Sequence, residues 1–256
     1  MFKGFGMGWS IFRQSVLALW HNAGTALRLS LIPSLLIVAA LVLAFAAVYA
    51  IPSRPGAAVT PVPFLAIWSA VFLILALVPA WIAVGWHRFM LLGERPRGWW
   101  PRLHGVNLGR YILRAVLVFL ATAVPTLIVG IVLVKYVLPT PASGGGYFLL
   151  KGCQLGLSLL WGAAILRFSP VLPAAALGET MPLEDALDAT VGTNGTMLAL
   201  VALIVATNIA LQILGFVPVI GILARLATGW VMMMIGISII TTVFARFVEE
   251  DQTAGD

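Results

Sequence analysis

The sequence predicts an all-α polytopic membrane protein with six transmembrane helices, because it is rich in apolar residues, poor in charge and divided into long apolar runs. Of its 256 residues, 61% are hydrophobic and 9% are charged, whereas a typical soluble domain has about 45–50% and about 25%. Such a composition could not cover a soluble surface, and disordered chains lack so many aliphatic and aromatic residues. We expect a single membrane domain over residues 1–256.

Six stretches are long and apolar enough to cross the roughly 30 Å of bilayer hydrocarbon, which takes about 20 residues in a helix. Continuous runs of this length favour helices over the short alternating strands of a barrel. Only the fourth and sixth stretches carry a charge, Lys151 and Arg225, each close to the start. In chain order the predicted spans are Ser30–Ile51, Pro63–Gly85, Ala115–Val134, Tyr147–Leu166, Met197–Phe216 and Ile222–Ala245.

The positions of lysine and arginine predict the orientation of the spans, because cytoplasmic loops are enriched in both residues. Arg54, Lys135, Lys151 and Arg225 lie toward one side of the membrane. All other basic residues lie toward the side of the two termini, which we therefore expect to be cytoplasmic. These are Lys3, Arg13, Arg28, Arg88, Arg95, Arg97, Arg102, Arg110, Arg114, Arg167 and Arg246.

Recurring short motifs predict an internal threefold repeat. The dipeptide Arg-Phe follows every even-numbered span, beginning at Arg88, Arg167 and Arg246, at equal intervals. The tripeptide Leu92-Gly93-Glu94 recurs as Leu177-Gly178-Glu179. Each unit crosses the membrane twice, so the copies would be parallel hairpin repeats. We expect repeats over residues 1–89, 90–168 and 169–247, followed by an acidic tail over 248–256.

Each hairpin is expected to follow a cytoplasmic interfacial helix lying in the headgroup plane. Trp9–Leu27 has apolar residues at three- and four-residue spacings. Arg97–Gly109 mixes tryptophans with arginines, and Pro182–Val191 begins with proline followed by two acids, which favour a helix N-terminus.

Polar residues toward the side opposite the termini form one candidate ligand site, because polar groups inside a membrane are costly and often functional. The alternative is structural: the cations extend toward the headgroups, and the amides hydrogen-bond between helices. The residues are Lys135, Lys151, Gln154, Asn208, Gln212 and Arg225.

The basic segment from Trp86 to Arg114 forms a second candidate, a site for anionic lipid headgroups. Its alternative role is topology determination alone, and nucleic acid is not an expected partner of so short a tethered segment. The headgroup candidates are Arg88, Arg95, Arg97, Arg102, Arg110, Trp99 and Trp100.

Gly152 and Gly156 form a G-x-x-x-G motif, which we expect to pack within the chain.

Catalytic signatures are missing from the sequence, so we expect no enzyme, cofactor or metal site. None of His21, His87 and His104 belongs to an H-E-x-x-H motif, and neither G-x-S-x-G nor a phosphate loop is present. No carboxylate lies inside a span, which disfavours an acidic proton relay. The single cysteine, Cys153, excludes a cysteine metal cluster.

The order of interfacial helix, hairpin, Arg-Phe and Leu-Gly-Glu-x-Pro resembles a group of uncharacterised bacterial six-span inner-membrane proteins. It is also similar to the membrane domain fused to some bacterial glycerophosphodiester phosphodiesterases. The resemblance is carried by Arg167-Phe168, Pro173, Leu177-Gly178-Glu179 and Leu183-Glu184-Asp185-Ala186.

That resemblance implies a bacterial inner-membrane location and no catalytic residue, since it covers the membrane part alone. We expect an accessory or membrane-organising protein that contacts membrane lipids, some of them anionic; its protein partner is unknown. The alternative function is a small transporter or lipid-handling protein with a periplasm-facing polar cavity.

Overall fold

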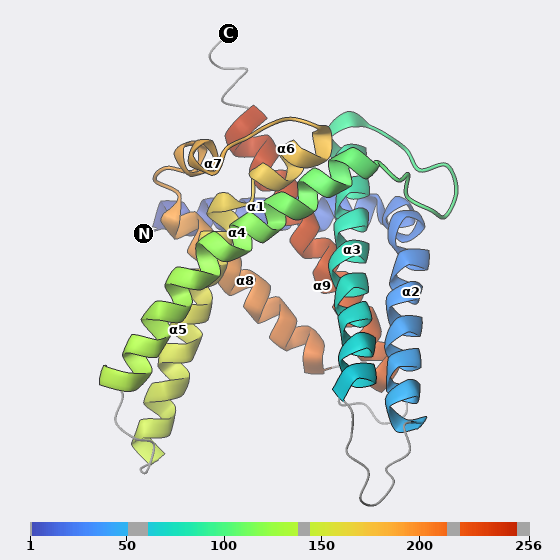
Figure 1. Ribbon diagram of the computed structural model, residues 1–256. Helices are drawn as coiled ribbons and strands as arrows, with labels where there is room; N and C mark the ends of the chain where they lie inside the picture. The colour runs from blue at the N-terminus through green and yellow to red at the C-terminus, as the bar shows by residue number, and fades with distance from the viewer. Residues whose placement is uncertain (1, 51–60, 138–143, 214–220, 250–256) are drawn as a thin grey trace, which may run out of the picture.

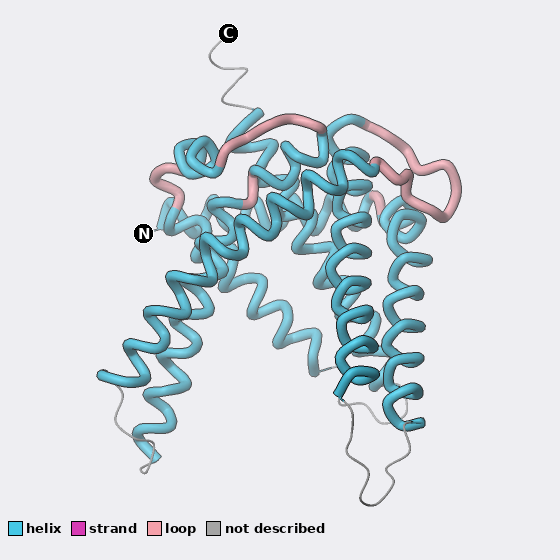
Figure 2. The backbone as a smooth tube through the Cα atoms, viewed as in Figure 1, coloured by secondary structure: helices cyan, strands magenta, loops and turns pink. Residues whose placement is uncertain are grey.

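The computed structural model describes residues 2–50, 61–137, 144–213 and 221–249, and every regular element in these ranges is helical (Figures 1 and 2). The elements are α1 (Phe2–His21), α2 (Ala23–Ala50), α3 (Pro61–Leu92), α4 (Gly105–Val132), the π-helical turn η1 (Leu133–Val137), α5 (Gly144–Phe168), α6 (Val171–Leu177), α7 (Leu183–Ala189), α8 (Asn194–Gln212), α9 (Gly221–Phe244) and the π-helical turn η3 (Ala245–Glu249).

Six of these helices, α2, α3, α4, α5, α8 and α9, are long and apolar enough to cross a membrane. Each of them overlaps one predicted span, so the all-α, multi-pass membrane class is confirmed. Arg54, the ends of the predicted spans at Ile51 and Phe216, and residues 250–256 of the acidic tail lie outside the described residues.

The helices are joined tightly at one end and separate toward the other (Figure 1). α1 crosses the ends of the spans, and α6, α7 and the loop 93–104 lie at the same end. We call these four segments the platform. From the platform the α2–α3 hairpin and the α4–α5 hairpin diverge; α8 descends between them, and α9 passes behind α3 (Figure 1).

The buried core lies in the platform half of the spans. Its largest fully buried side chains include Ile11 of α1, Trp86 of α3, Met197 of α8 and Phe244 of α9. α9 is the central helix, with half of its most apolar window buried, against 11% for α2 and for α4. The outer helices are therefore mostly left to lipid.

Small residues explain why the helices meet at the platform. Lipid gives apolar helices no hydrophobic reason to associate, so close backbone contact and hydrogen bonds decide where they pack. A methyl group added at Gly8 would lie 2.9 Å from Cβ of Ala199, and one added at Gly162 would lie 2.8 Å from Cγ1 of Val201. Gly4 packs in the same way against the backbone at Gly195.

Hydrogen bonds between helices also lie toward this end. The Ser15 hydroxyl donates to Oγ1 of Thr242 over 2.9 Å, which joins α1 to α9. The indole of Trp230 donates to Oγ of Ser30 over 2.7 Å, and the indole of Trp161 donates to Oγ1 of Thr122 over 3.1 Å. The platform end is thus fixed by polar and small-residue contacts.

The predicted interfacial helices are only partly correct. The first ends at His21 and turns at Asn22, so it does not extend to Leu27. The second, Arg97–Gly109, is wrong, because the structure has no helix over residues 93–104 and α4 begins at Gly105. Proline at 96 and 101, together with Gly98 at φ 103°, prevents a helix there. The third is formed as α7, preceded by Pro182.

The repeated tripeptide marks the same local turn but ends different elements. Gly93 and Gly178 both have positive φ, 69° and 97°, the left-handed conformation in which glycine ends a helix. Gly93 ends the span α3, whereas Gly178 ends α6, a short buried helix that the sequence analysis did not separate. The threefold repeat therefore stays a prediction.

The G-x-x-x-G motif of α5 does not pack within the described chain. A methyl group added at Gly152 or Gly156 would have no atom of another residue within 4 Å, and both residues are exposed. The expectation of internal packing at this motif was wrong.

Candidate functional site

The six polar residues predicted as a ligand site do not form one cluster. Lys151 and Gln154 lie near the start of α5, and Asn208 and Gln212 lie on the last turns of α8. These two helix ends lie far apart in Figure 1. Arg225 is exposed on α9, near its start.

Two hydrogen bonds among these polar side chains each join residues of one helix. The ammonium of Lys151 lies 3.4 Å from Oε1 of Gln154, and the Gln212 amide donates to Oδ1 of Asn208. Each pair lies on a single helix, and within the described ranges no hydrogen bond from the side-chain amides of Gln154, Asn208 or Gln212 reaches another helix. The tertiary structure favours separate lipid-side positions over a shared binding site.

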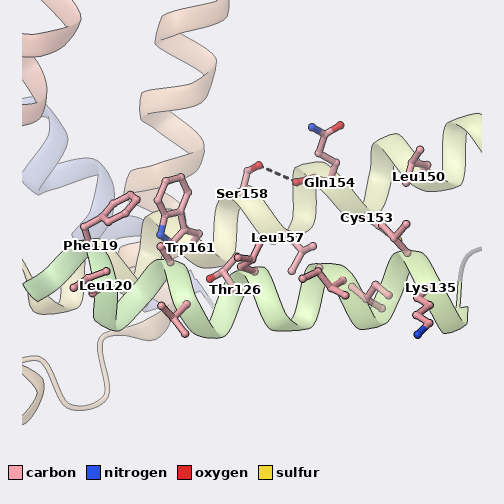
Figure 3. A pocket seen from close by; sticks show the side chains of 17 residues that line it. Phe119, Leu120, Thr126, Lys135, Leu150, Cys153, Gln154, Leu157, Ser158 and Trp161 are labelled. Atoms are coloured by element: carbon pink, nitrogen blue, oxygen red, sulfur yellow. Dashed lines mark hydrogen bonds between the residues drawn. The ribbon is translucent and has the colours of Figure 1, made fainter. Parts of the chain in front are cut away.

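A groove of about 960 Å³ runs between α4 and α5 (Figure 3). It is mainly apolar, with Phe119, Leu127, Leu157 and Trp161 among its lining side chains. Figure 3 shows that the polar ends of Lys135 and Gln154, which border the groove, point away from the opposite helix. Such a surface suits hydrocarbon chains better than a polar ligand.

At the platform, Arg88 joins α3 to α6. Its Nε and Nη2 donate to the two carboxylate oxygens of Glu94 over 2.9 and 2.6 Å, a bidentate pair. Its Nη1 donates to the carbonyl of Ala176 over 3.0 Å, in the last turn of α6. The Arg88 side chain is only 12% exposed. Arg88 therefore has a structural role, and its role as a headgroup ligand stays a prediction.

The groups around Glu94 shift the pKa of its carboxyl. The hydrogen bond from Arg88 is the main reason that the pKa of the Glu94 carboxyl is lowered, and the nearby charges of Arg88, His104 and Arg102 act in the same direction. His104 Nε2 lies 3.5 Å from the carboxylate. Burial opposes the shift, but it is outweighed.

The C-terminal end of α6 also receives donors from α4. Asn107 donates to the carbonyl of Ala176 over 3.1 Å, and Arg110 donates to the carbonyl of Gly178 over 3.0 Å. Cations and amides at a helix C-terminus satisfy its free carbonyls and complement its dipole. Arg110, a second predicted headgroup residue, is exposed but is directed to this backbone.

Arg167, the arginine of the second Arg-Phe dipeptide, joins α5 to the following segments. Its Nη2 donates to the carbonyl of Leu187 over 3.1 Å at the end of α7, and its Nη1 donates to Oδ1 of Asn194 over 3.2 Å at the start of α8. Thr190 Oγ1 lies 3.4 Å from Nε. Arg88 and Arg167 thus each tie a span to the end of a short platform helix.

The buried side chain of His87 on α3 is held by hydrogen bonds to other core residues. His87 Nδ1 lies 2.8 Å from Thr241 Oγ1, and Nε2 lies 3.4 Å from the Tyr111 hydroxyl. Because the Thr241 hydroxyl donates to the carbonyl of Ile237, it accepts from Nδ1 of His87, and Nε2 accepts from Tyr111. The network joins α3, α4 and α9. Across the described residues, no group of three or more His, Cys, Asp or Glu side chains could hold a metal.

The loop 93–104 holds the remaining predicted headgroup residues. Trp81 of α3 donates from its indole to the carbonyl of Arg102 over 3.2 Å, and its ring stacks on Trp100 with centroids 5.9 Å apart. Pro101 is buried against α3, where a methyl group on Gly85 would lie 3.3 Å from its Cβ. The side chains that the loop exposes are those of Arg95, Arg97, Trp99, Trp100, Arg102 and Leu103.

Trp81 and Gly85, the two α3 residues that hold this loop, were not among the residues predicted from the sequence. Both lie inside or at the end of a predicted span, where tryptophan and glycine are common. A tryptophan about two turns before the basic end of a span was the available signal, since tryptophan is enriched at membrane interfaces.

No protein family, curated protein or solved structure matches the chain.

Proposed function

We propose that this protein is a non-enzymatic, membrane-organising component of the bacterial inner membrane, with both termini and the platform in the cytoplasm. The observation that carries this proposal is the separation of the hairpins. Contacts between helices concentrate at the platform, while α2 and α4 leave most of their span surfaces exposed. Lipid would then enter between the hairpins, and the platform would hold them at fixed positions.

The orientation is supported by where the arginines lie. Arg95, Arg97 and Arg102 are on the platform, and the described cations at the other end are Lys135, Lys151 and Arg225. Positive charge is retained on the cytoplasmic side of inner-membrane proteins.

A non-enzymatic role is supported by the structural contacts of two arginines and a histidine that could otherwise take part in catalysis. Arg88 and Arg167 bind helix ends, and His87 bonds to two hydroxyl groups without a carboxylate. A general acid–base or nucleophilic site needs a base next to a nucleophile and an opening for substrate. Arg88, Arg167 and the fully buried His87 do not form such a combination.

Site-directed spin labelling tests this proposal at Ile209, which is 61% exposed and adjacent to Asn208. The only native cysteine, Cys153, is first changed to serine. In nanodiscs we expect a label at Ile209 to be accessible to oxygen and inaccessible to a water-soluble nickel chelate, as lipid contact requires. A label at Leu43 on α2 is the lipid-exposed control, and one at Val191, in the turn after α7, is the water-exposed control.

The second candidate is a small transporter or lipid-handling protein with a periplasm-facing polar cavity. The groove between α4 and α5 favours its lipid-handling form, because this groove is mainly apolar and large enough for acyl chains. High nickel accessibility at Ile209, matching the label at Val191, would reject the membrane-organising proposal and favour the transporter.

A further inference from the structure

The loop 93–104 leaves three arginines without an acidic partner. Its one acid, Glu94, is already paired with Arg88 and lies near His104. Arg95, Arg97 and Arg102 are exposed and form no ion pair with any described residue. Three guanidinium groups therefore remain on one short loop, which makes the loop a candidate for binding an anion.

The loop is held beside α3 rather than above its end. Trp81, on which Trp100 stacks, lies about three turns before Leu92, or roughly 16 Å along the helix axis. The buried contact of Pro101 with Gly85 lies one turn after Trp81. The polypeptide thus leaves α3 and folds back toward the membrane.

The aromatic side chains of the loop fit the boundary between headgroups and hydrocarbon. Trp99 and Trp100 are 51% and 50% exposed. Tryptophan is enriched at this boundary because its ring is apolar and its N–H is polar. Exposed tryptophans among arginines are therefore expected at headgroup depth, not in bulk water.

The position of α1 also indicates that the loop lies at headgroup depth. α1 lies across the spans, and in Figure 1 the outer bend of the loop is at the height of α1. The outward face of α1 carries exposed Trp9, Arg13 and Trp20, a combination typical of helices in the headgroup plane. The loop and α1 thus share one level on the molecule.

We infer that the loop 93–104 binds the phosphate headgroup of an anionic phospholipid in the cytoplasmic leaflet. Arg95, Arg97 and Arg102 supply planar donors that match phosphate oxygens, and Trp99 and Trp100 contact the glycerol and upper acyl region. This inference deepens the proposed function by naming a ligand class, and it rests on the proposed orientation.

Native mass spectrometry of the full chain tests the inference, after release from nanodiscs of equal phosphatidylglycerol and phosphatidylcholine. The test variant is R95Q/R97Q/R102Q. The matched control, K135Q/K151Q/R225Q, removes the same charge from the other end of the spans. The measured quantity is the ratio of phosphatidylglycerol to phosphatidylcholine adducts retained on the protein.

We expect the wild-type protein to retain phosphatidylglycerol preferentially and the test variant to lose this preference by at least about fivefold, the contribution of one arginine near an anionic surface. The control should keep the wild-type ratio. An unchanged ratio in the test variant, an equal loss in the control, or retention of a nucleotide or acidic peptide in place of lipid would each overturn the inference.

The variant Trp100→Leu keeps the inference testable if the triple variant does not fold. It retains all three arginines but removes the ring stack with Trp81, so we expect a smaller loss of preference; an unchanged ratio would count against the aromatic part of the site. The spin-label result at Ile209 is independent of these ratios, so failure of the lipid site and failure of the proposed function are distinguishable.

Discussion

Replacing Gly8 with alanine tests whether close backbone packing holds α1 onto α8. The new methyl group would lie 2.9 Å from Cβ of Ala199 and 3.0 Å from the carbonyl oxygen of Thr196. Favourable contacts between carbon atoms lie at about 3.5–4.0 Å, so the two helices must move apart. Gly6 is the matched control, because it is in the same helix and a methyl group there would meet no other residue within 4 Å.

The difference in stability between Gly8→Ala and Gly6→Ala measures the packing effect at Gly8. Alanine is more favourable than glycine in a helix by about 1 kcal/mol, and this gain applies at both positions. Overpacking typically costs about 1–3 kcal/mol. Gly6→Ala should therefore stabilise the protein slightly, and Gly8→Ala should be about 1–3 kcal/mol less stable than Gly6→Ala.

Thermal unfolding in detergent, followed by intrinsic tryptophan fluorescence, measures this difference. A change of 1 kcal/mol shifts Tm by about 2–4 °C in a chain of this size class, so the two Tm values should differ by at least about 2 °C. The double variant G8A/A199G should recover part of the loss, because it removes the closer contact. Equal Tm values for Gly6→Ala and Gly8→Ala would refute the packing argument.

Three further predictions concern the polar contacts. The hydrogen bond from Arg88 lowers the pKa of Glu94, so ionised Glu94 stabilises the fold fully above the unfolded-state pKa, about 4.3, and this stabilisation is lost as pH falls through the folded-state pKa. Between pH 6 and pH 3, Tm of the wild-type protein should therefore fall more than Tm of Glu94→Gln. Parallel curves of Tm against pH for the two proteins would contradict this. Arg167→Gln should cost about 1–3 kcal/mol and increase protease cleavage between α6 and α8, as measured by limited proteolysis; wild-type cleavage would mean that the arginine does not hold this segment. Thr241→Val should leave Nδ1 of His87 unpaired in the core and lower stability by about 1–3 kcal/mol, whereas an unchanged Tm would show that the network is not needed.

The platform contacts show where sequence reasoning was insufficient. Arg88 and Arg95 are the same residue type in the same basic segment, yet one binds Glu94 and the end of α6 while the other is exposed. The partner carbonyl, on Ala176, lies far along the chain. The Arg-Phe dipeptide marks Arg88 in the sequence, but it does not identify the partner carbonyl, because this contact forms only after folding.

Glycine motifs illustrate the same limit. Gly152-x-x-x-Gly156 is a motif that the sequence analysis singled out, but its added methyl groups would meet nothing. Gly4 and Gly8 have the same spacing, and they pack against Gly195 and Ala199. A spacing of four places two small residues on one helix face, but only the tertiary structure decides whether another helix lies on that face.

The sequence by itself determined the membrane class, the six helices and the concentration of positive charge toward one side. These properties follow from the bilayer, which requires about 20 apolar residues in each span and acts on every span separately. Tertiary structure alone decided that the helices join at the platform and separate elsewhere, and therefore that the polar residues of α5 and α8 do not meet. The physical reason is that lipid solvates apolar helix surfaces as well as another helix does, so arrangement depends on a few close contacts and hydrogen bonds between distant segments.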